Sequence, residues 1–152
     1  MKKSGILLYL LFFSIVCFGQ VEANRKKTFN LKNGIAIDGY DPVRYFNGEP
    51  EKGKEQFKWT YKGIAYLFVN PGNLNSFKTS PDKYEPAYGG WCAYAMGDSG
   101  EKIKIDPETF KILDNRLYLF YNFWGNNTLK DWNKDEKELR TAADQNWLKI
   151  IR

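Results

Sequence analysis

A chain of 152 residues has room for one compact domain, and its composition does not fit an intrinsically disordered protein. Hydrophobic residues make up 43% of the sequence and aromatic residues 17%, which is enough material for a core rich in aromatic rings. The net charge of +5 comes from basic residues that are scattered among acidic and apolar ones. Nucleic-acid binding requires a clustered basic face, so no nucleic-acid partner is expected.

The N-terminal residues have the three-part layout of a secretory signal. Two lysines precede an apolar run, and small residues then lead into a polar stretch. The run is shorter than the roughly 20 apolar residues that a membrane span requires. We expect a signal peptide over residues 1–19, with cleavage after Ala23 as the alternative; lipidation of Cys17 and a retained anchor are two further readings. The sequence therefore predicts an exported protein, periplasmic or extracellular, with no transmembrane anchor after cleavage.

The cysteine and histidine counts limit the chemistry of the mature chain. Cleavage would leave Cys92 as the only cysteine, and the sequence contains no histidine. An intramolecular disulfide is then impossible. Zinc and copper sites draw on cysteine, histidine and methionine, and Met96 is the only further ligand of these types. We therefore expect no stable transition-metal site in the monomer, and neither Ser-His-Asp nor Cys-His catalysis.

The first part of the mature chain is polar. Residues 20–34 are interpreted as a loose, polar lead-in, and residues 35–37 as a short strand. Asp41 followed by Pro42 is a pattern typical of a helix start, because aspartate caps helices and proline suits the first helical position. A short helical segment is therefore expected after Asp41.

Two hairpins are predicted from alternating apolar and polar residues. The first covers residues 57–69 and turns at Lys62-Gly63, and the second covers residues 109–121 and turns at Asp114-Asn115. Further cap-and-proline pairs at 70–71 and 80–81 predict short helices, and helical spacing begins near residue 126. The expected fold is α+β: a small antiparallel sheet of two hairpins packed with short helices and a C-terminal helix, in a single domain over residues 35–152.

Cys92 lies in the stretch YEPAYGGWCAYAMGD, after two glycines and among aromatic residues. Three interpretations are open: a buried apolar residue, a partly exposed thiol that acts as a ligand or reactive group, and an intermolecular disulfide. In the second, the glycines would let the backbone approach a bound molecule beside an aromatic pocket walled by four rings. The candidate ligand-binding residues are Asp38, Tyr40, Asp41, Tyr88, Gly89, Gly90, Trp91, Cys92 and Tyr94.

Asp38 and Asp41 form a second candidate constellation, since two carboxylates three residues apart can perform acid-base work or hold a hard cation. Both also have ordinary structural explanations. Asp41 is accounted for by capping, and Asp38 followed by Gly39 is a common turn pair.

Five motifs occur in the order found in a known family. They are IDGYDPVRYF at 37–46, the aromatic hairpin at 57–69, SFKTSPDKY at 76–84, YGGWCAY at 88–94 and AADQNW at 142–147. Together they resemble the exported branch of the YHS-domain proteins, over residues 35–150. The resemblance implies a small module related to heavy-metal-binding domains that accompany metal-transport proteins.

The chain departs from that family where a metal site would need it. The resemblance implies a cysteine after Asp-Pro-Val and further cysteine and histidine after the hairpin, but Arg44 stands at the first position and the segment after the hairpin has neither. The expected function is an exported, non-catalytic binding or accessory module whose partner is a small ligand or an envelope protein. The alternatives are a thiol-dependent redox protein that uses Cys92 and a purely structural envelope protein.

Overall fold

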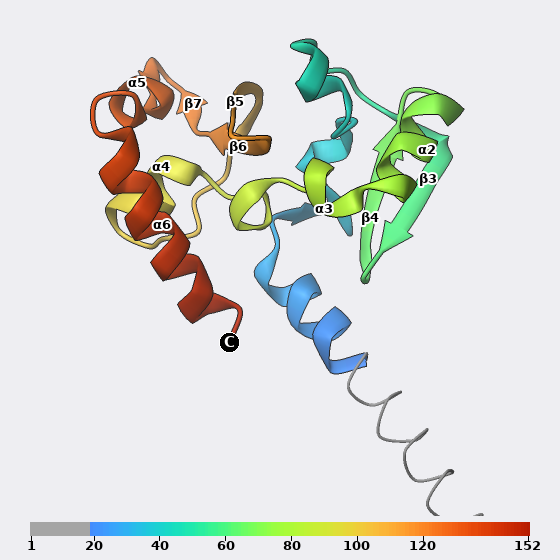
Figure 1. Cartoon of the computed structure of the whole chain (residues 1–152), viewed down its shortest axis with the longest axis horizontal. Helices are drawn as coiled ribbons and strands as arrows, with labels where there is room; N and C mark the ends of the chain where they lie inside the picture. Colours follow the sequence, from blue (N-terminus) through green and yellow to red (C-terminus); the bar gives the residue numbers. More distant parts are fainter. Residues whose placement is uncertain (1–18) are drawn as a thin grey trace, which may run out of the picture.

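The two predicted hairpins are present and lie apart, the first at one side of the molecule and the second near its middle (Figure 1). The computed structural model describes residues 19–152, so the predicted signal peptide falls outside them except for its last residue. Strands β3 (Lys54–Tyr61) and β4 (Ile64–Phe68) form the first hairpin, and β5 (Asp106–Leu113) and β6 (Arg116–Phe120) form the second. Both turns fall at the predicted residues, and the α+β class is confirmed.

The hairpins belong to separate sheets, whereas one shared sheet was expected. The first joins β1 (Leu31–Lys32) and β2 (Ile35–Ala36) in a four-stranded sheet of order β1-β2-β4-β3, in which β2 and β4 are parallel. The free edge of β6 is occupied instead by the segment 86–92, through bridges from Pro86 to Leu117 and from Cys92 to Leu119. Both sides of β4 and of β6 are therefore occupied by other segments, and the two hairpins belong to different sheets.

Short helices connect and cover these sheets (Figure 1). The α-helices that follow the first hairpin are α2 (Pro71–Thr79), α3 (Pro81–Tyr84), α4 (Ala93–Asp98), α5 (Thr128–Trp132) and α6 (Glu136–Ile150). The 3-10 helices are η1 (Ile37–Gly39), η2 (Arg44–Asn47) and η3 (Ala87–Gly90), and a small hairpin is made by β7 (Asn122–Phe123) and β8 (Asn126–Asn127).

The predicted helix starts are met in different ways. Asn70 caps α2, because its Oδ1 accepts a hydrogen bond of 2.8 Å from the backbone N–H of Asn73. Asp41 Oδ1 accepts a hydrogen bond of 2.8 Å from the N–H of Val43. This bond closes a turn, and the 3-10 helix η2 begins only at Arg44.

The segment before β1 is helical and packed, which corrects the expectation of a loose lead-in. Residues 19–28 form a helix that contains both expected cleavage points. Thr28 and Phe29 at its end are buried, and Arg25 forms an ion pair with Glu85, 60 residues away. The polar composition of these residues did not predict a helix. The helix is stabilised by an ion pair and a few apolar contacts.

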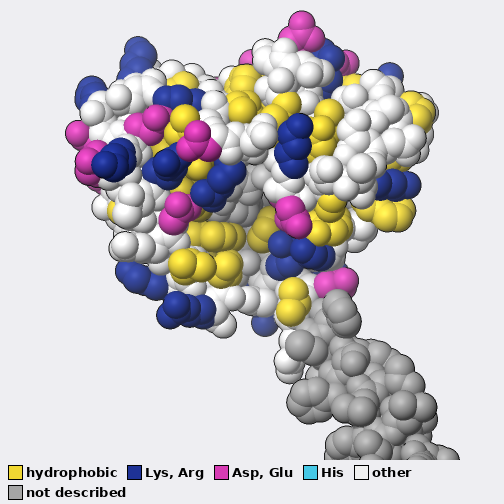
Figure 2. Space-filling view, viewed as in Figure 1, with side chains coloured by type: hydrophobic (Ala, Val, Ile, Leu, Met, Phe, Trp, Pro, Cys, Tyr) yellow, Lys and Arg dark blue, Asp and Glu magenta, His cyan; other side chains and the backbone are white. Residues whose placement is uncertain are grey.

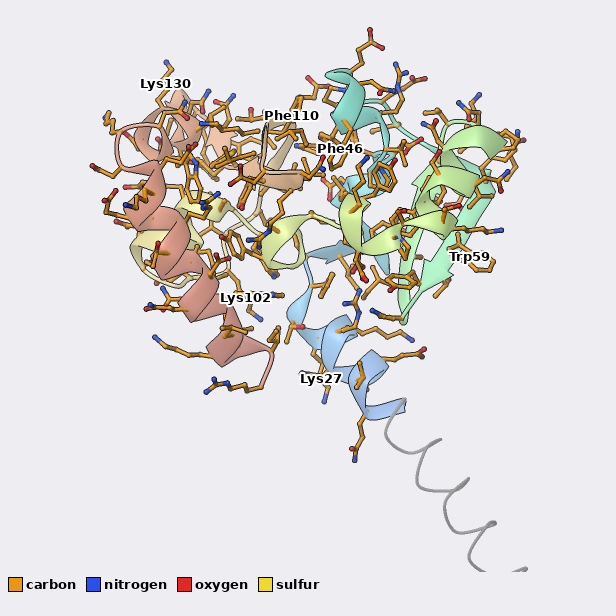
Figure 3. The ribbon with its side chains drawn as sticks, in the orientation of Figure 1. Lys27, Phe46, Trp59, Lys102, Phe110 and Lys130 are labelled. Carbon is orange, nitrogen blue, oxygen red and sulfur yellow. The ribbon has the colours of Figure 1, made fainter. Side chains whose placement is uncertain are left out.

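Two buried clusters form the core. The first surrounds Phe77 of α2. The centroid of its ring lies 4.8 Å from the ring centroid of Tyr66 and 5.1 Å from that of Phe68. The second surrounds Trp132 of α5, which is fully buried against β6 and α4. Figure 3 shows Phe46 and Phe110 between the β3–β4 hairpin and the helices α4 and α6, and both side chains pack against the first cluster. Among residues 19–152, no helix is both long and apolar enough to cross a membrane.

Candidate functional site

The turn η3 is a run of left-handed backbone. The φ angles of Tyr88, Gly89 and Gly90 are 54°, 60° and 82°, a region that glycine adopts without strain. Gly89 is required for a second reason, because a Cβ there would lie 2.8 Å from Cη2 of Trp147 on α6. Glycine therefore suits this turn, and Gly89 marks a close approach between η3 and the Trp147 side chain of α6.

The segment after the N-terminal helix is fastened to this turn by hydrogen bonds. The backbone N–H of Asn30 donates to the carbonyl of Gly89 at 2.9 Å, and the Asn30 side chain donates to the carbonyl of Gly90 at 3.0 Å. The Trp91 indole N–H donates to the carbonyl of Thr28 at 2.6 Å. These contacts hold the helix over residues 19–28 in place above η3.

A cleft of about 410 Å³ lies between this helix, η3 and the end of α6, and we call it the Tyr88 cleft. In Figure 2, hydrophobic side chains gather between the N-terminal helix and α6, with basic and acidic side chains on both sides. The lining mixes apolar residues, three of them aromatic, with polar and charged ones; the residues are Val21, Asn24, Arg25, Thr28, Phe29, Asp82, Glu85, Pro86, Ala87, Tyr88, Gly89, Arg116, Trp147 and Ile151.

The charged groups that line the cleft already have partners within the protein. Glu85 accepts 2.5 Å hydrogen bonds from both Arg25 and the hydroxyl of Tyr66, and its side chain is only 12% exposed. Burial, followed by the charge of Glu85, raises the pKa of Tyr66 well above its ordinary value, so this hydroxyl remains a donor.

The other wall of the cleft repeats this arrangement. Asp144 accepts hydrogen bonds from Arg116 at 3.0 Å and from the Tyr88 hydroxyl at 3.1 Å. Burial, followed by the Asp144 carboxylate, raises the pKa of Tyr88 far above the usual range, while Arg116 opposes this rise. The wall is therefore polar but electrically balanced near neutral pH.

Cys92 does not face this cleft. It is fully buried at the start of α4, its Sγ lies 3.4 Å from Oγ1 of Thr128, and the N–H of Tyr121 donates to Sγ at 3.4 Å. These contacts support the interpretation of Cys92 as a buried apolar residue. Its position gives no support to a reactive exposed thiol or to an intermolecular disulfide.

Cys92 is expected to react with a thiol reagent such as dithionitrobenzoate only after unfolding, because the native structure gives the reagent no access. The measurement compares labelling in buffer and in guanidinium, in a Cys17→Ser background so that one thiol remains. Ala93→Gly, which loosens the start of α4, should speed native labelling. Complete labelling of the native protein within minutes would contradict the buried assignment.

The four aromatic residues expected to wall one pocket are dispersed. Tyr88 lines the cleft, and Trp91 is engaged by the backbone of Thr28. Tyr94 packs between the two core clusters, and Tyr40 reaches away to Glu108, to which its hydroxyl donates at 3.0 Å. The prediction of a single pocket walled by these four rings is wrong.

The two aspartates have separate positions. Asp41 is fully buried and its carboxylate accepts from Val43, Val69 and Asn73, which ties three segments together. Asp38 is exposed, pairs loosely with Lys32 at 3.8 Å and borders a second cavity. Among residues 19–152, no three Cys, His, Asp or Glu side chains lie close enough to share a metal ion.

The sequence analysis missed most of the charged groups of the cleft. Arg25 and Glu85 are 60 residues apart, and Arg116 and Asp144 are 28 residues apart, so no local spacing connects them. The available signal was weak: Glu85 stands directly before Pro86, outside any predicted helix.

The chain was compared with models of protein families, with curated proteins and with solved structures, and none of the three comparisons gave a match. The resemblance to YHS-domain proteins therefore rests on the five sequence motifs alone.

Proposed function

We propose that the chain is an exported, non-catalytic binding module of the YHS type, which takes a small molecule with an apolar body in the Tyr88 cleft. The observation that carries this proposal is the cleft itself, about 410 Å³ in volume and bounded by the left-handed turn at Tyr88 and Gly89. Pockets of this size with apolar walls and a few convergent polar groups are typical of small-molecule sites.

The paired charges favour an uncharged ligand. Arg25 and Glu85 neutralise each other, as do Arg116 and Asp144, while Asp82 pairs with Lys62 at 3.4 Å. A charged ligand would have to displace one of these partners and leave it without a counter-ion. An apolar body against Phe29 and Trp147, with a polar group near the Tyr88 hydroxyl, fits without that cost.

The positions of the candidate catalytic groups support a non-catalytic role. The Cys92 thiol is buried, the Asp41 carboxylate is saturated by three hydrogen bonds, and the chain contains no histidine. General acid-base or thiol catalysis requires a group that can reach its substrate.

The uncharged fluorescent probe N-phenylnaphthylamine is expected to bind with increased emission, because it places an aromatic body in an apolar cleft. Ile151→Trp enlarges a side chain that lines the cleft and should weaken binding about tenfold or more, equivalent to about 1.4 kcal/mol. Titration of the probe into each variant measures the affinity.

Leu148→Trp is the matched control. Leu148 lies in the last turn of α6, three residues before Ile151, and is 50% exposed, but it does not line the cleft, so this variant should bind like the wild type. Absence of probe binding to the wild type, or equal affinity in both tryptophan variants, would refute the cleft as a ligand site and favour a purely structural role.

A further inference from the structure

A second cavity lies away from the Tyr88 cleft and has no part in the function proposed above. It has a volume of about 420 Å³ and is bounded by β1, the turn η1, the segment before β5 and the β7–β8 hairpin, which stands between α5 and β5 in Figure 1. We call it the Trp124 pocket. Its lining residues are Asn30, Leu31, Lys32, Asp38, Lys104, Ile105, Tyr121, Phe123 and Trp124.

One wall consists of three aromatic rings that adjoin one another. The ring centroids of Tyr121 and Phe123 are 5.1 Å apart, and those of Phe123 and Trp124 are 6.1 Å apart. Trp124 is 95% exposed and Phe123 is 40% exposed. The rings therefore present apolar faces to solvent at the rim of a cavity, an arrangement that contributes little to folding and suits a ligand that stacks.

The backbone holds two of the lining residues in unfavourable conformations. Trp124 occupies the hairpin turn with a φ of 51°, where glycine or asparagine is preferred. On the opposite wall, Asp38 has a φ of 51°, and the buried Ile37 directly before it has a φ of 53°, where a β-branched residue is an outlier. Strain of this kind is concentrated at binding sites, and here it sets the indole and the Asp38 carboxylate on two sides of the pocket.

The polar groups of the pocket include both donors and acceptors. Lys104 is exposed and has no ion pair among residues 19–152, and the Lys32 ammonium lies 3.8 Å from the Asp38 carboxylate, outside hydrogen-bond range. Because the amide nitrogen of Asn30 already donates to Gly90, its oxygen remains as an acceptor. Two ammonium groups against one carboxylate leave the pocket with a positive charge of one.

We propose that the Trp124 pocket binds an acidic carbohydrate, a sugar residue that carries a carboxylate. The C–H faces of the sugar ring stack on the indole, its hydroxyls donate to Asp38 and Asn30, and its carboxylate pairs with Lys104. A proline-rich peptide is the other occupant of aromatic grooves, but its proline residues offer carbonyl acceptors and lack N–H donors. It would leave the Asp38 and Asn30 oxygens without partners, so the hydroxylated ligand fits better.

Isothermal titration of the full chain with digalacturonate tests this proposal, with the uncharged disaccharide maltose as comparison. Digalacturonate is expected to bind at least about tenfold more tightly than maltose, because only the acid pairs with Lys104. Trp124→Ala should weaken digalacturonate binding about tenfold or more, and Lys104→Gln should abolish the preference for the acid. Both side chains are exposed, so both variants should keep the circular dichroism spectrum of the wild type.

Matched controls separate the pocket from general surface effects. Trp59→Ala removes another exposed indole, on the outer face of β3, and Lys130→Gln removes another exposed lysine, on α5 (Figure 3). Neither lines the pocket, and both variants should bind like the wild type. No binding of digalacturonate, equal affinity for maltose, or affinity unchanged by Trp124→Ala would overturn the proposal. Trp124-dependent binding of a proline decamer in place of the sugar would overturn it too, and would assign a peptide groove.

Discussion

Replacing Asp41 with alanine is expected to lower the free energy of unfolding by about 4 kcal/mol, because two buried donors and one half-buried donor lose their acceptor together. Asp41 Oδ1 accepts from the N–H of Val43 at 2.8 Å, and Oδ2 accepts from the N–H of Val69 at 2.9 Å and from Nδ2 of Asn73 at 2.7 Å. These donors belong to the turn before η2, the end of β4 and the first turn of α2. Urea denaturation followed by tryptophan fluorescence measures the loss.

Two further variants define the effect of Asp41. Asp41→Asn keeps one oxygen for the donors of β4 and α2 but turns an amide N–H₂ toward the Val43 N–H, so its loss should be smaller than that of alanine. Asp38→Asn, in the same loop but exposed and able to keep its left-handed φ of 51°, should change stability by about 0.5 kcal/mol or less. A loss below about 1 kcal/mol for Asp41→Ala would show that water replaces the carboxylate.

The role of Asp41 illustrates what the sequence could and could not predict. The bond to Val43 is local, and the Asp-Pro pair predicts it. The bonds to Val69 and Asn73 span 28 and 32 residues, and they exist only because β4 and α2 fold back over the turn. A local pattern predicts that a carboxylate caps a turn, but not that the same carboxylate is the junction of three segments.

The same limit applies to the sheets. Alternation of apolar and polar residues predicted both hairpins and their turns, because strand and turn preferences are set within a few residues. The partner of each hairpin was not predictable in this way. It is decided by the segments 31–36 and 86–92, which occupy the edges of β4 and β6. A short strand was predicted at 35–37 and β2 lies there, but its pairing with β4 and the bridges made by 86–92 leave no local pattern in the sequence.

The candidate sites were likewise predictable only where a local sequence pattern indicates them. The paired glycines after Tyr88 led to the hypothesis that the backbone there lies close to a bound molecule, and the Tyr88 cleft borders this turn. The Trp124 pocket was not predicted, although Trp124 directly before Gly125 in a two-residue hairpin turn was a usable signal, since tryptophan is rare at such a position. One side of the cleft is formed by the helix over residues 19–28, and the polar composition of those residues did not predict a helix.

Gly97→Ala is expected to destabilise the protein by about 3 kcal/mol, although alanine is the better helix former by about 1 kcal/mol. Gly97 lies on α4 where that helix crosses α6, and a Cβ there would stand 2.4 Å from the carbonyl oxygen of Leu139 and 3.0 Å from its carbonyl carbon. Both atoms belong to the backbone of α6, so a rotation of a side chain cannot relieve the clash. Thermal and urea denaturation measure the effect.

The clash at Gly97 also bears on the candidate function, because only two residues separate the end of η3 from the start of α4, and α6 carries Trp147 at the cleft. Forcing the two helices apart should widen the Tyr88 cleft and weaken the binding of N-phenylnaphthylamine along with stability. Gly72→Ala in α2 is the matched control: its Cβ would meet only the side-chain oxygen of Asn70 at 3.1 Å, so a change within about 1 kcal/mol is expected. Equal behaviour of the two alanine variants would mean that α4 and α6 separate freely, and that the cleft wall is not rigid enough to select a ligand.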